Sequence, residues 1–404
     1  MLAFYNIGVH IYSFAVFIAS FFNPKAKLWL QGRKGLIELI ERETSGFSGE
    51  TIWVHCASLG EFEMARPVME RLKESDSKLR IVLTFFSPSG YEVRKNYTVA
   101  DYVYYLPLDT HANAKRFVAA IKPNKVIFVK YDLWYHYLKQ AKKHGATLLL
   151  ISAQFRPSQQ YFKFYGIVAR RALLMFGKIF LVDEASEQLL NQINVKNTTV
   201  CGDTRYDRVM EVAHSVKRNT NIEDFRANSK LVVCGSTWAE DEKIIVNSIN
   251  YFSDVKWIVA PHEVGEENIQ RLEKLFPNSI RYSSYINSDA KVLIIDSIGL
   301  LNQLYGYADV AYVGGGFRTG LHNILEATAF GVPTVFGPDA SRFPDATEMT
   351  EKGLAFSIAN SLQLQTKFDE LLNQDQLNLR GAITQFMNSR TGATEAILEY
   401  TNKC

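Results

Sequence analysis

The stretch that decides the fold is Val313-Gly-Gly-Gly-Phe-Arg-Thr-Gly-Leu-His-Asn-Ile-Leu-Glu326, followed by Ala-Thr-Ala-Phe-Gly-Val-Pro333. The apolar run 310–313 at its start is typical of a buried parallel strand. Three glycines then let the backbone turn sharply and approach a ligand without a Cβ in the way. Asn323 is expected to cap a helix whose free N–H groups suit a phosphate. The stretch therefore predicts a strand, a turn and a helix that together bind a phosphorylated ligand.

Glu326 lies about one turn into this helix, where a carboxylate accepts hydrogen bonds from sugar hydroxyls. A glycine turn after a strand occurs in many α/β proteins, so the glycines alone leave an ordinary turn open. The combination of glycines, His322, Asn323, Glu326 and Gly-Val-Pro is more specific and favours a nucleotide-sugar site.

The rest of the chain alternates short apolar runs with amphipathic helices, which predicts doubly wound parallel sheets. The 404 residues suffice for two such domains. We expect an anchor with a basic collar at 1–35, one Rossmann-like domain at 36–215, a second at 216–385, and a helix at 386–404 that crosses back to the first. A net charge of +3 is too small to indicate nucleic-acid binding.

The N-terminal run 1–22 is rich in Phe, Ile, Val and Ala, and it meets Lys25, Lys27, Arg33 and Lys34 without an intervening acidic residue. A cleaved signal peptide has its positive charge before the apolar run, which is the reverse order. Positive charge after the run keeps that side cytoplasmic. We predict an uncleaved anchor that spans the membrane or lies in its interface; a buried core helix is the alternative.

Polar residues follow the predicted strands at their carboxyl ends, where such sheets bind ligands. In the second half they are Ser236 and Thr237 after one strand, and Pro261 and His262 after the next. In the first half the candidates are, in chain order, Ser58, Gly60, Glu61, Ser87, Ser89, Asp132 and Arg156. Helix capping is the alternative for the hydroxyl residues, and a solvated surface charge is the alternative for Arg156.

Several of these phrases resemble motifs of one enzyme family. The block 314–326 resembles the nucleotide-sugar site of GT-B glycosyltransferases, and more closely the Gly-Gly…His-Asn-x-Leu-Glu block of Kdo transferases. Ser58-Leu-Gly-Glu61 is similar to the Ser-x-Gly-Glu motif of that family, and Pro107-Leu-Asp109 to its Pro-x-Asp phrase. Lys130-Tyr-Asp132-Leu-Trp134 falls where the family has Glu-x-Glu-x-Trp, with Lys130 replacing the first glutamate. The family arginine after Pro261 is absent here.

The resemblance implies a GT-B fold, with two Rossmann-like domains facing a cleft, and transfer of Kdo (3-deoxy-manno-octulosonic acid) from CMP-Kdo to a lipid A precursor with inversion. It implies that Glu61 is the general base, with Glu63 as its rival. The implied donor-binding residues are Ser236, Thr237, Pro261, His262, Gly314, Gly315, Gly316, His322, Asn323 and Glu326, and the implied acceptor-binding residues are Ser58, Gly60, Ser87, Ser89, Asp132 and Arg156.

No metal or other cofactor is expected, because no Asp-x-Asp pair lies near a predicted strand end and helix N–H groups can carry the phosphate charge. The expected location is the inner membrane, with both domains on the cytoplasmic side and no nucleic acid as partner. Two alternatives stay open: another GT-B enzyme, such as a UDP-sugar transferase or an epimerase, and a non-catalytic anchored scaffold.

Overall fold

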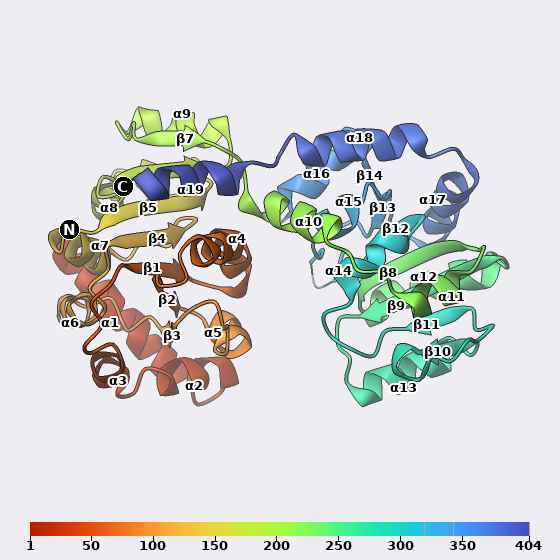
Figure 1. Ribbon diagram of the computed structural model, residues 1–404, viewed down its shortest axis with the longest axis horizontal. Coiled ribbons are helices and arrows are strands. Elements are labelled where there is room, and N and C mark those ends of the chain that lie inside the picture. Colours follow the sequence, from red (N-terminus) through yellow and green to blue (C-terminus); the bar gives the residue numbers. More distant parts are fainter. Residues whose placement is uncertain (319, 342, 404) are drawn as a thin grey trace. The chain divides into compact units, whose positions relative to one another are not determined.

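The computed structural model describes residues 1–318, 320–341 and 343–403. The chain divides into two compact units. Unit 1 comprises residues 1–208 and 390–404, and unit 2 comprises residues 209–389. These divisions lie seven residues before the boundary expected at 215/216 and four residues after the one expected at 385/386. Figure 1 labels the elements of both units.

Unit 1 is built on a parallel sheet of order β3-β2-β1-β4-β5-β6-β7. Its strands are β1 (Thr51–Cys56), β2 (Arg80–Phe85), β3 (Tyr102–Tyr105), β4 (Lys125–Val129), β5 (Thr147–Ala153), β6 (Lys178–Leu181) and β7 (Thr198–Val200). Its helices are α1 (Leu2–Ala19), α2 (Pro24–Gln31), α3 (Leu36–Glu43), α4 (Leu59–Ser75), α5 (Pro88–Arg94), α6 (His111–Ile121), α7 (Tyr135–Lys143), α8 (Ile167–Leu173), α9 (Glu184–Gln192) and α19 (Ala393–Lys403), with α10 (Thr204–His214) running across the division.

Both faces of this sheet are buried, which explains why its strands are almost continuously apolar. Trp53 of β1 packs into one core with Phe117 of α6 and Tyr137 of α7. Ile52 of β1 points to the opposite core, which also contains Ile397 of α19. The last helix is tied further by Asp207, which accepts hydrogen bonds from the amides of Gly392 and Thr394, both at 2.6 Å.

Unit 2 repeats the arrangement with a parallel sheet of order β10-β11-β9-β8-β12-β13-β14. The strands are β8 (Lys230–Thr237), β9 (Val255–Pro261), β10 (Ser279–Arg281), β11 (Val292–Ile294), β12 (Val310–Val313), β13 (Thr334–Phe336) and β14 (Ala355–Ser357). The helices are α11 (Thr220–Arg226), α12 (Ala239–Tyr251), α13 (Glu266–Leu275), α14 (Leu301–Leu304), α15 (Leu325–Thr328), α16 (Pro344–Glu351), α17 (Ser361–Asn373) and α18 (Leu377–Asn388).

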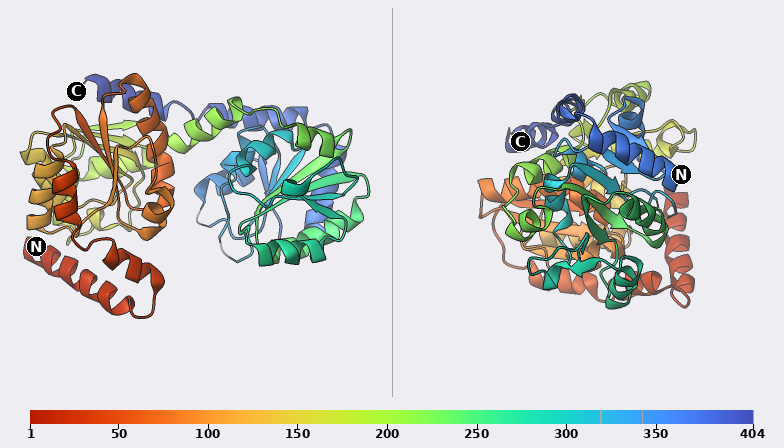
Figure 2. Two further views of the ribbon diagram at one scale, coloured as in Figure 1. Left: turned by 60° about the horizontal axis from the view of Figure 1, so that its bottom comes forward. Right: turned by 90° about the vertical axis from the view of Figure 1, so that its right-hand side faces the viewer.

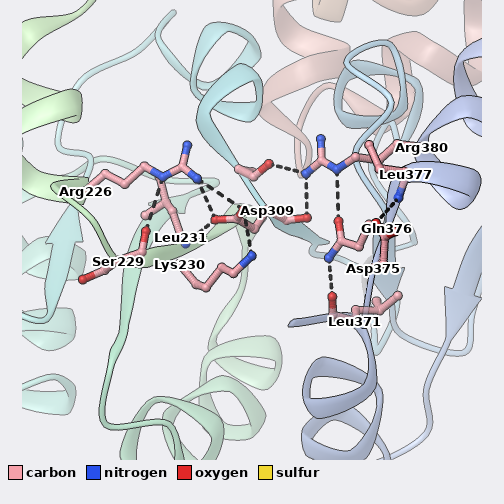
Figure 3. A network of polar contacts seen from close by, with 11 residues as sticks. Arg226, Ser229, Lys230, Leu231, Asp309, Leu371, Asp375, Gln376, Leu377 and Arg380 are labelled. Atoms are coloured by element: carbon pink, nitrogen blue, oxygen red, sulfur yellow. Dashed lines mark hydrogen bonds and ion pairs between the residues drawn. The ribbon is translucent and has the colours of Figure 1, made fainter. Parts of the chain in front are cut away.

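A polar network around Asp309, just before β12, joins three elements of unit 2 (Figure 3). Its carboxylate accepts from the amide of Leu231 at 2.8 Å and pairs with Arg226 of α11 at 3.0 Å. The carbonyl of Asp309 accepts from Arg380 of α18 at 2.9 Å. Gly331 lets α18 approach closely, because a Cβ at this position would lie 2.7 Å from Thr384 Oγ1.

The sequence pattern missed two strands, β10 and β14. Each is three residues long and lies at an edge of the second sheet. Such a short edge strand carries almost no hydrophobic periodicity, because it is buried less than the central strands.

Candidate active site

One candidate site lies at the carboxyl ends of β1 and β4, which are neighbours in the sheet of unit 1. β1 ends at Cys56, and the chain enters α4 at Leu59 after Ser58, which is the helix N-cap. Glu61 lies in the first turn of α4, and its carboxylate turns back to accept a short hydrogen bond from the amide of Ala57. The strand end and the helix start therefore hold this carboxyl group in one orientation.

The carboxyl group of Glu61 is in an environment that favours its neutral form. The residue is only 7% exposed. Burial, reinforced by the negative charge of Asp132, raises the pKa of Glu61 to about 7, although the amide of Ala57 and the charge of Lys130 act to lower it. A carboxyl group with a pKa near 7 can accept and release a proton at neutral pH, as a general base requires. Its rival Glu63 forms ion pairs instead, with Arg94 at 2.9 Å and Arg66 at 3.8 Å.

Lys130 and Asp132 lie in the loop that leaves β4. Lys130 has a φ of +61°, a left-handed conformation that is costly for a residue with a side chain. Burial raises the pKa of Asp132 and lowers the pKa of Lys130. The loop is fixed by Tyr161, which donates to the carbonyl of Tyr131 at 2.6 Å, and by Trp134, which donates to His55 at 3.1 Å. Glu61, Asp132 and Lys130 thus form one group of interacting charges.

Gly60 directly precedes Glu61 at the start of α4. Gly60 lies inside the first turn of α4 and has no positive φ. A Cβ at this position would meet only Ser58 Oγ, at 4.0 Å. Gly60 therefore has no steric reason within the described structure to be a glycine, although its open position beside Glu61 leaves room for a ligand.

The remaining predicted acceptor residues are placed less closely together. Ser87 caps α5 by accepting from the amide of Ser89 at 3.2 Å, and the two hydroxyls are 3.0 Å apart, as the capping alternative expected. Arg156 follows β5 and is exposed. Among the described residues its guanidinium forms no hydrogen bond or ion pair, but its charge contributes to lowering the pKa of Lys130. Arg156 therefore belongs to the group around Lys130.

A second candidate site, in unit 2, is the glycine turn after β12. Gly315 has a φ of +92°, which requires glycine. At Gly314 a Cβ would lie 2.4 Å from the carbonyl oxygen of Ser236, and at Gly316 it would lie 2.8 Å from the backbone of Gly337. The glycines thus serve close packing of the backbone as well as access for a ligand.

Sequence reasoning missed Asp241, which organises this turn. Its carboxylate accepts from the amide of Gly315 at 2.9 Å, from the amide of Trp238 at 2.9 Å and from the hydroxyl of Tyr312 at 2.7 Å. Asp241 is 1% exposed. The acidic start of α12 was visible in the sequence, but only the fold shows that one of its carboxylates lies beneath the glycine turn.

The helix expected after Asn323 is only one turn long. α15 begins at Leu325, and Asn323 accepts from the amide of Leu325 at 3.2 Å and donates to Glu326 at 3.3 Å. A single turn has a weak dipole, so this helix start is a poorer phosphate site than the sequence predicted. Asn323 and Glu326 do lie side by side. Glu326 is half-buried, and one of its carboxyl oxygens accepts a hydrogen bond from the side-chain amide of Asn323.

Three stacked rings join the ends of β8 and β9 to the glycine block. The ring centroids of Trp238 and His262 are 4.6 Å apart, and those of His262 and His322 are also 4.6 Å apart. Trp238 donates to Nε2 of His322 at 2.9 Å, and burial together with His262 lowers the pKa of His322 to about 4. His322 is therefore neutral near pH 7, and sequence reasoning missed Trp238 as its partner.

The two hydroxyl residues at the end of β8 differ in how far a ligand can reach them. Thr237 is buried, and its hydroxyl donates to Glu242 at 3.0 Å. Ser236 is half-buried and has a φ of +52°, so the strand end at β8 is strained where it meets the glycine turn. Pro261 is the buried last residue of β9. Among the described residues, no group of three or more His, Cys, Asp or Glu side chains is arranged to hold a metal ion.

Two doubly wound parallel sheets, each with polar residues at the carboxyl ends of its strands, define a protein of the GT-B fold class. Solved structures agree on the fold: a UDP-GlcNAc 2-epimerase from Neisseria meningitidis has a TM-score of 0.59 at 15% identity, covering 88% of this chain and 100% of its own. A putative UDP-N-acetylglucosamine 2-epimerase from Listeria monocytogenes has a TM-score of 0.58 at 12% identity, covering 87% of this chain and 95% of its own.

The sequence comparisons define the family. Residues 30–208 match the family described as 3-Deoxy-D-manno-octulosonic-acid transferase (kdotransferase). The 3-deoxy-D-manno-octulosonic acid transferase of Chlamydia pneumoniae is 30% identical over 306 residues, which cover 72% of this chain and 70% of that protein. The enzyme of the same name from Aquifex aeolicus is 28% identical over 330 residues, covering 80% and 86%. The chain belongs to the Kdo transferase family.

Proposed function

We propose that this protein transfers Kdo from CMP-Kdo to a lipid A precursor, with inversion at the anomeric carbon and with Glu61 as general base. The observation that carries this proposal is the buried carboxyl group of Glu61, at a strand's carboxyl end, with a pKa raised to about 7. Membership of the family supports the reaction class, and the geometry of unit 1 supports the choice of base.

The reaction is a single displacement. The acceptor hydroxyl attacks the anomeric carbon of the donor while its proton passes to Glu61. The bond between that carbon and the phosphate oxygen of CMP breaks, and its electron pair leaves with CMP. The sugar carbon carries oxocarbenium-like charge in the transition state, by analogy with glycoside cleavage. A carboxylate near the acceptor hydroxyl both takes the proton and stabilises this positive charge.

The donor is assigned to unit 2. We propose that Glu326, held beside Asn323, accepts hydrogen bonds from the ribose hydroxyls. The rings of Trp238, His262 and His322 offer a flat platform next to the glycine turn. The phosphate is proposed to meet Ser236, His262 and the amide of Gly316, without a divalent ion. His262 is exposed, so it is available for this role in place of the missing family arginine.

The acceptor is assigned to unit 1, and the enzyme is proposed to work at the cytoplasmic face of the inner membrane. The hydropathy of Leu2–Ala19 averages 1.6, and only 6% of this helix is buried, so it is apolar and exposed enough to contact lipid. The cations after the helix suit the anionic cytoplasmic leaflet. Ser58, Gly60 and Asp132 lie near Glu61, and Arg156 lies near Lys130. All four are proposed to orient the acceptor sugar.

The test is incubation with CMP-Kdo and a tetra-acylated lipid A precursor in the presence of EDTA, followed by mass spectrometry. The expected product has gained the mass of at least one Kdo residue. A thermal-shift panel run in parallel is expected to give stabilisation by CMP but not by UMP or UDP, because a ligand stabilises the state that binds it. Stabilisation by UDP alone would indicate a UDP-sugar enzyme, and CMP binding without turnover would indicate a scaffold.

A further inference from the structure

Helix α1 is docked along the outside of unit 1 by polar contacts at its first turns (Figure 2). The hydroxyl of Tyr5 donates a short hydrogen bond to Asp109 and accepts from the amide of Tyr135 at 3.3 Å. Asn6 and His136 form a hydrogen bond of 2.7 Å. These contacts use Tyr5 and Asn6, two polar residues of a mostly apolar run. They hold α1 against the folded unit.

The opposite face of α1 is apolar and open. Its members recur every three or four residues and are 48–72% exposed: Phe4, Ile7, Ile11, Phe14 and Ile18. A helix with one face on a protein and an apolar face outward fits the plane of a bilayer interface. The basic residues Lys25 and Lys27 follow at its end. This orientation puts the adjoining surface of unit 1 at the membrane.

A groove of about 390 Å³ lies between the start of α1 and α8. Its apolar lining residues are Met1, Phe4, Leu133, Val168, Ala169 and Ala172. Phe4 belongs both to the groove and to the exposed face of α1, so the groove opens where that face meets lipid. Its rim includes Tyr165, next to Phe164, which is 92% exposed. An apolar groove with an apolar rim favours a hydrocarbon ligand.

The groove is connected to the candidate base through one loop. Leu133 lines the groove, and the adjacent Asp132 is the residue whose negative charge helps to raise the pKa of Glu61. Trp134, the next residue, donates to His55 of β1, the strand that leads to Glu61. A chain held in the groove therefore lies beside the loop that shapes the surroundings of the carboxyl group.

We infer that this groove binds one acyl chain of the lipid acceptor, entering from the bilayer, and so brings the acceptor sugar to Glu61. The inference rests on the proposed function and deepens it, because it names a subsite for the lipid part of the acceptor. The occupant is a lipid rather than a peptide, since the groove adjoins the apolar face of α1 and its lining, among the described residues, contains no charged side chain. Its polar lining residues are Tyr5, Tyr135, Gln160 and Tyr165.

The test uses the full-length protein with Ala169→Trp, which fills the groove from α8. For the tetra-acylated acceptor, KM should rise about tenfold, the loss expected when about two methylene groups are no longer buried. For the deacylated acceptor and for CMP-Kdo, KM should be unchanged. Ala396→Trp on α19, also half-buried on a helix, is the matched control and should leave every KM unchanged. Ala169→Leu, with a smaller side chain, should show the same effect to a smaller degree.

Three results separate the possibilities. Equal KM changes for acylated and deacylated acceptors would overturn the inference. Ala169→Trp could also lose binding to vesicles of phosphatidylethanolamine and phosphatidylglycerol without any change in the KM for the acceptor. This result would overturn the inference too, because the groove would then hold a membrane lipid. Absence of transfer by the unmodified protein to either acceptor would contradict the proposed function instead.

Discussion

The pKa of Glu61, the proposed base, depends on two neighbours of opposite charge. Burial and Asp132 raise its pKa to about 7, and Lys130 opposes this. Lys130 occupies the position of the first glutamate in the family motif that it resembles. Its positive charge lowers the pKa of Glu61, whereas a glutamate at this position would raise that pKa. The consequence is a base that is partly ionised at neutral pH.

Replacing Lys130 by Met tests this balance. Because only ionised Glu61 can take a proton, the rate should rise with pH through about 7 in the unmodified enzyme. Loss of the Lys130 charge raises the pKa of Glu61 further, so the acid limb of the pH–kcat profile should move to higher pH. Lys130→Arg keeps the charge and should restore the original limb. Superimposable profiles for the unmodified enzyme and Lys130→Met would exclude this role.

Glu326→Ala tests the donor site at the same scale. The carboxylate is proposed to accept ribose hydroxyl bonds, and hydrogen bonds to charged groups contribute about 1.5–3 kcal/mol. The affinity for CMP, measured by calorimetry, should therefore fall about tenfold to hundredfold. Glu240→Ala, at an exposed carboxylate of the same unit paired with Arg318, is the control and should bind CMP normally. An unchanged affinity in Glu326→Ala would remove this residue from the donor site.

At the scale of elements, the long and fully buried strands were predictable and the short elements were not. The strands β1, β4 and β8 are recognisable in the sequence as apolar runs, because both faces of each sheet are covered. The length of α15 was overestimated, because the glycine block and Asn323 resemble the start of a longer helix. Glu61 was predicted from its motif, and its role stays a prediction. Asp241 and Trp238 act through contacts between the start of α12 and the glycine block that no local pattern encodes.

Helix α1 depends on one buried carboxylate. Asp109 is 1% exposed and bonds Tyr5 and the amides of His136 and Tyr137. Asp109→Ala leaves these donors unpaired, and the free energy of unfolding should fall by about 2–4 kcal/mol. Asp76→Ala, at an exposed position, should change it by no more than about 0.5 kcal/mol. Urea unfolding in detergent measures both. In Asp109→Ala, proteolysis should also cleave the α1–α2 segment faster. Stability equal to that of Asp76→Ala would mean that Asp109 does not hold α1.

At the scale of the whole molecule, the proposed function gives the two units separate tasks. Unit 1 carries α1, the groove and Glu61, and it also takes the last residues of the chain, 390–404. Unit 2 carries the glycine turn, the three stacked rings and Glu326. We therefore predict that substitutions can lower the transfer rate without weakening CMP binding, or weaken CMP binding alone, because Glu61 and Glu326 lie in different compact units.

The most direct measurement is the transfer rate of Glu61→Gln with CMP-Kdo and the tetra-acylated acceptor. Glu63→Gln, the same substitution two residues further along α4, is the matched control. Glu61→Gln cannot take a proton, so kcat should fall by about 10²–10⁴-fold, while the melting-temperature shift with CMP stays the same. Glu63→Gln, which removes only the partly exposed ion pairs with Arg94 and Arg66, should keep near-normal turnover. Near-normal turnover of Glu61→Gln, or an equal loss in both variants, would contradict Glu61 as the base.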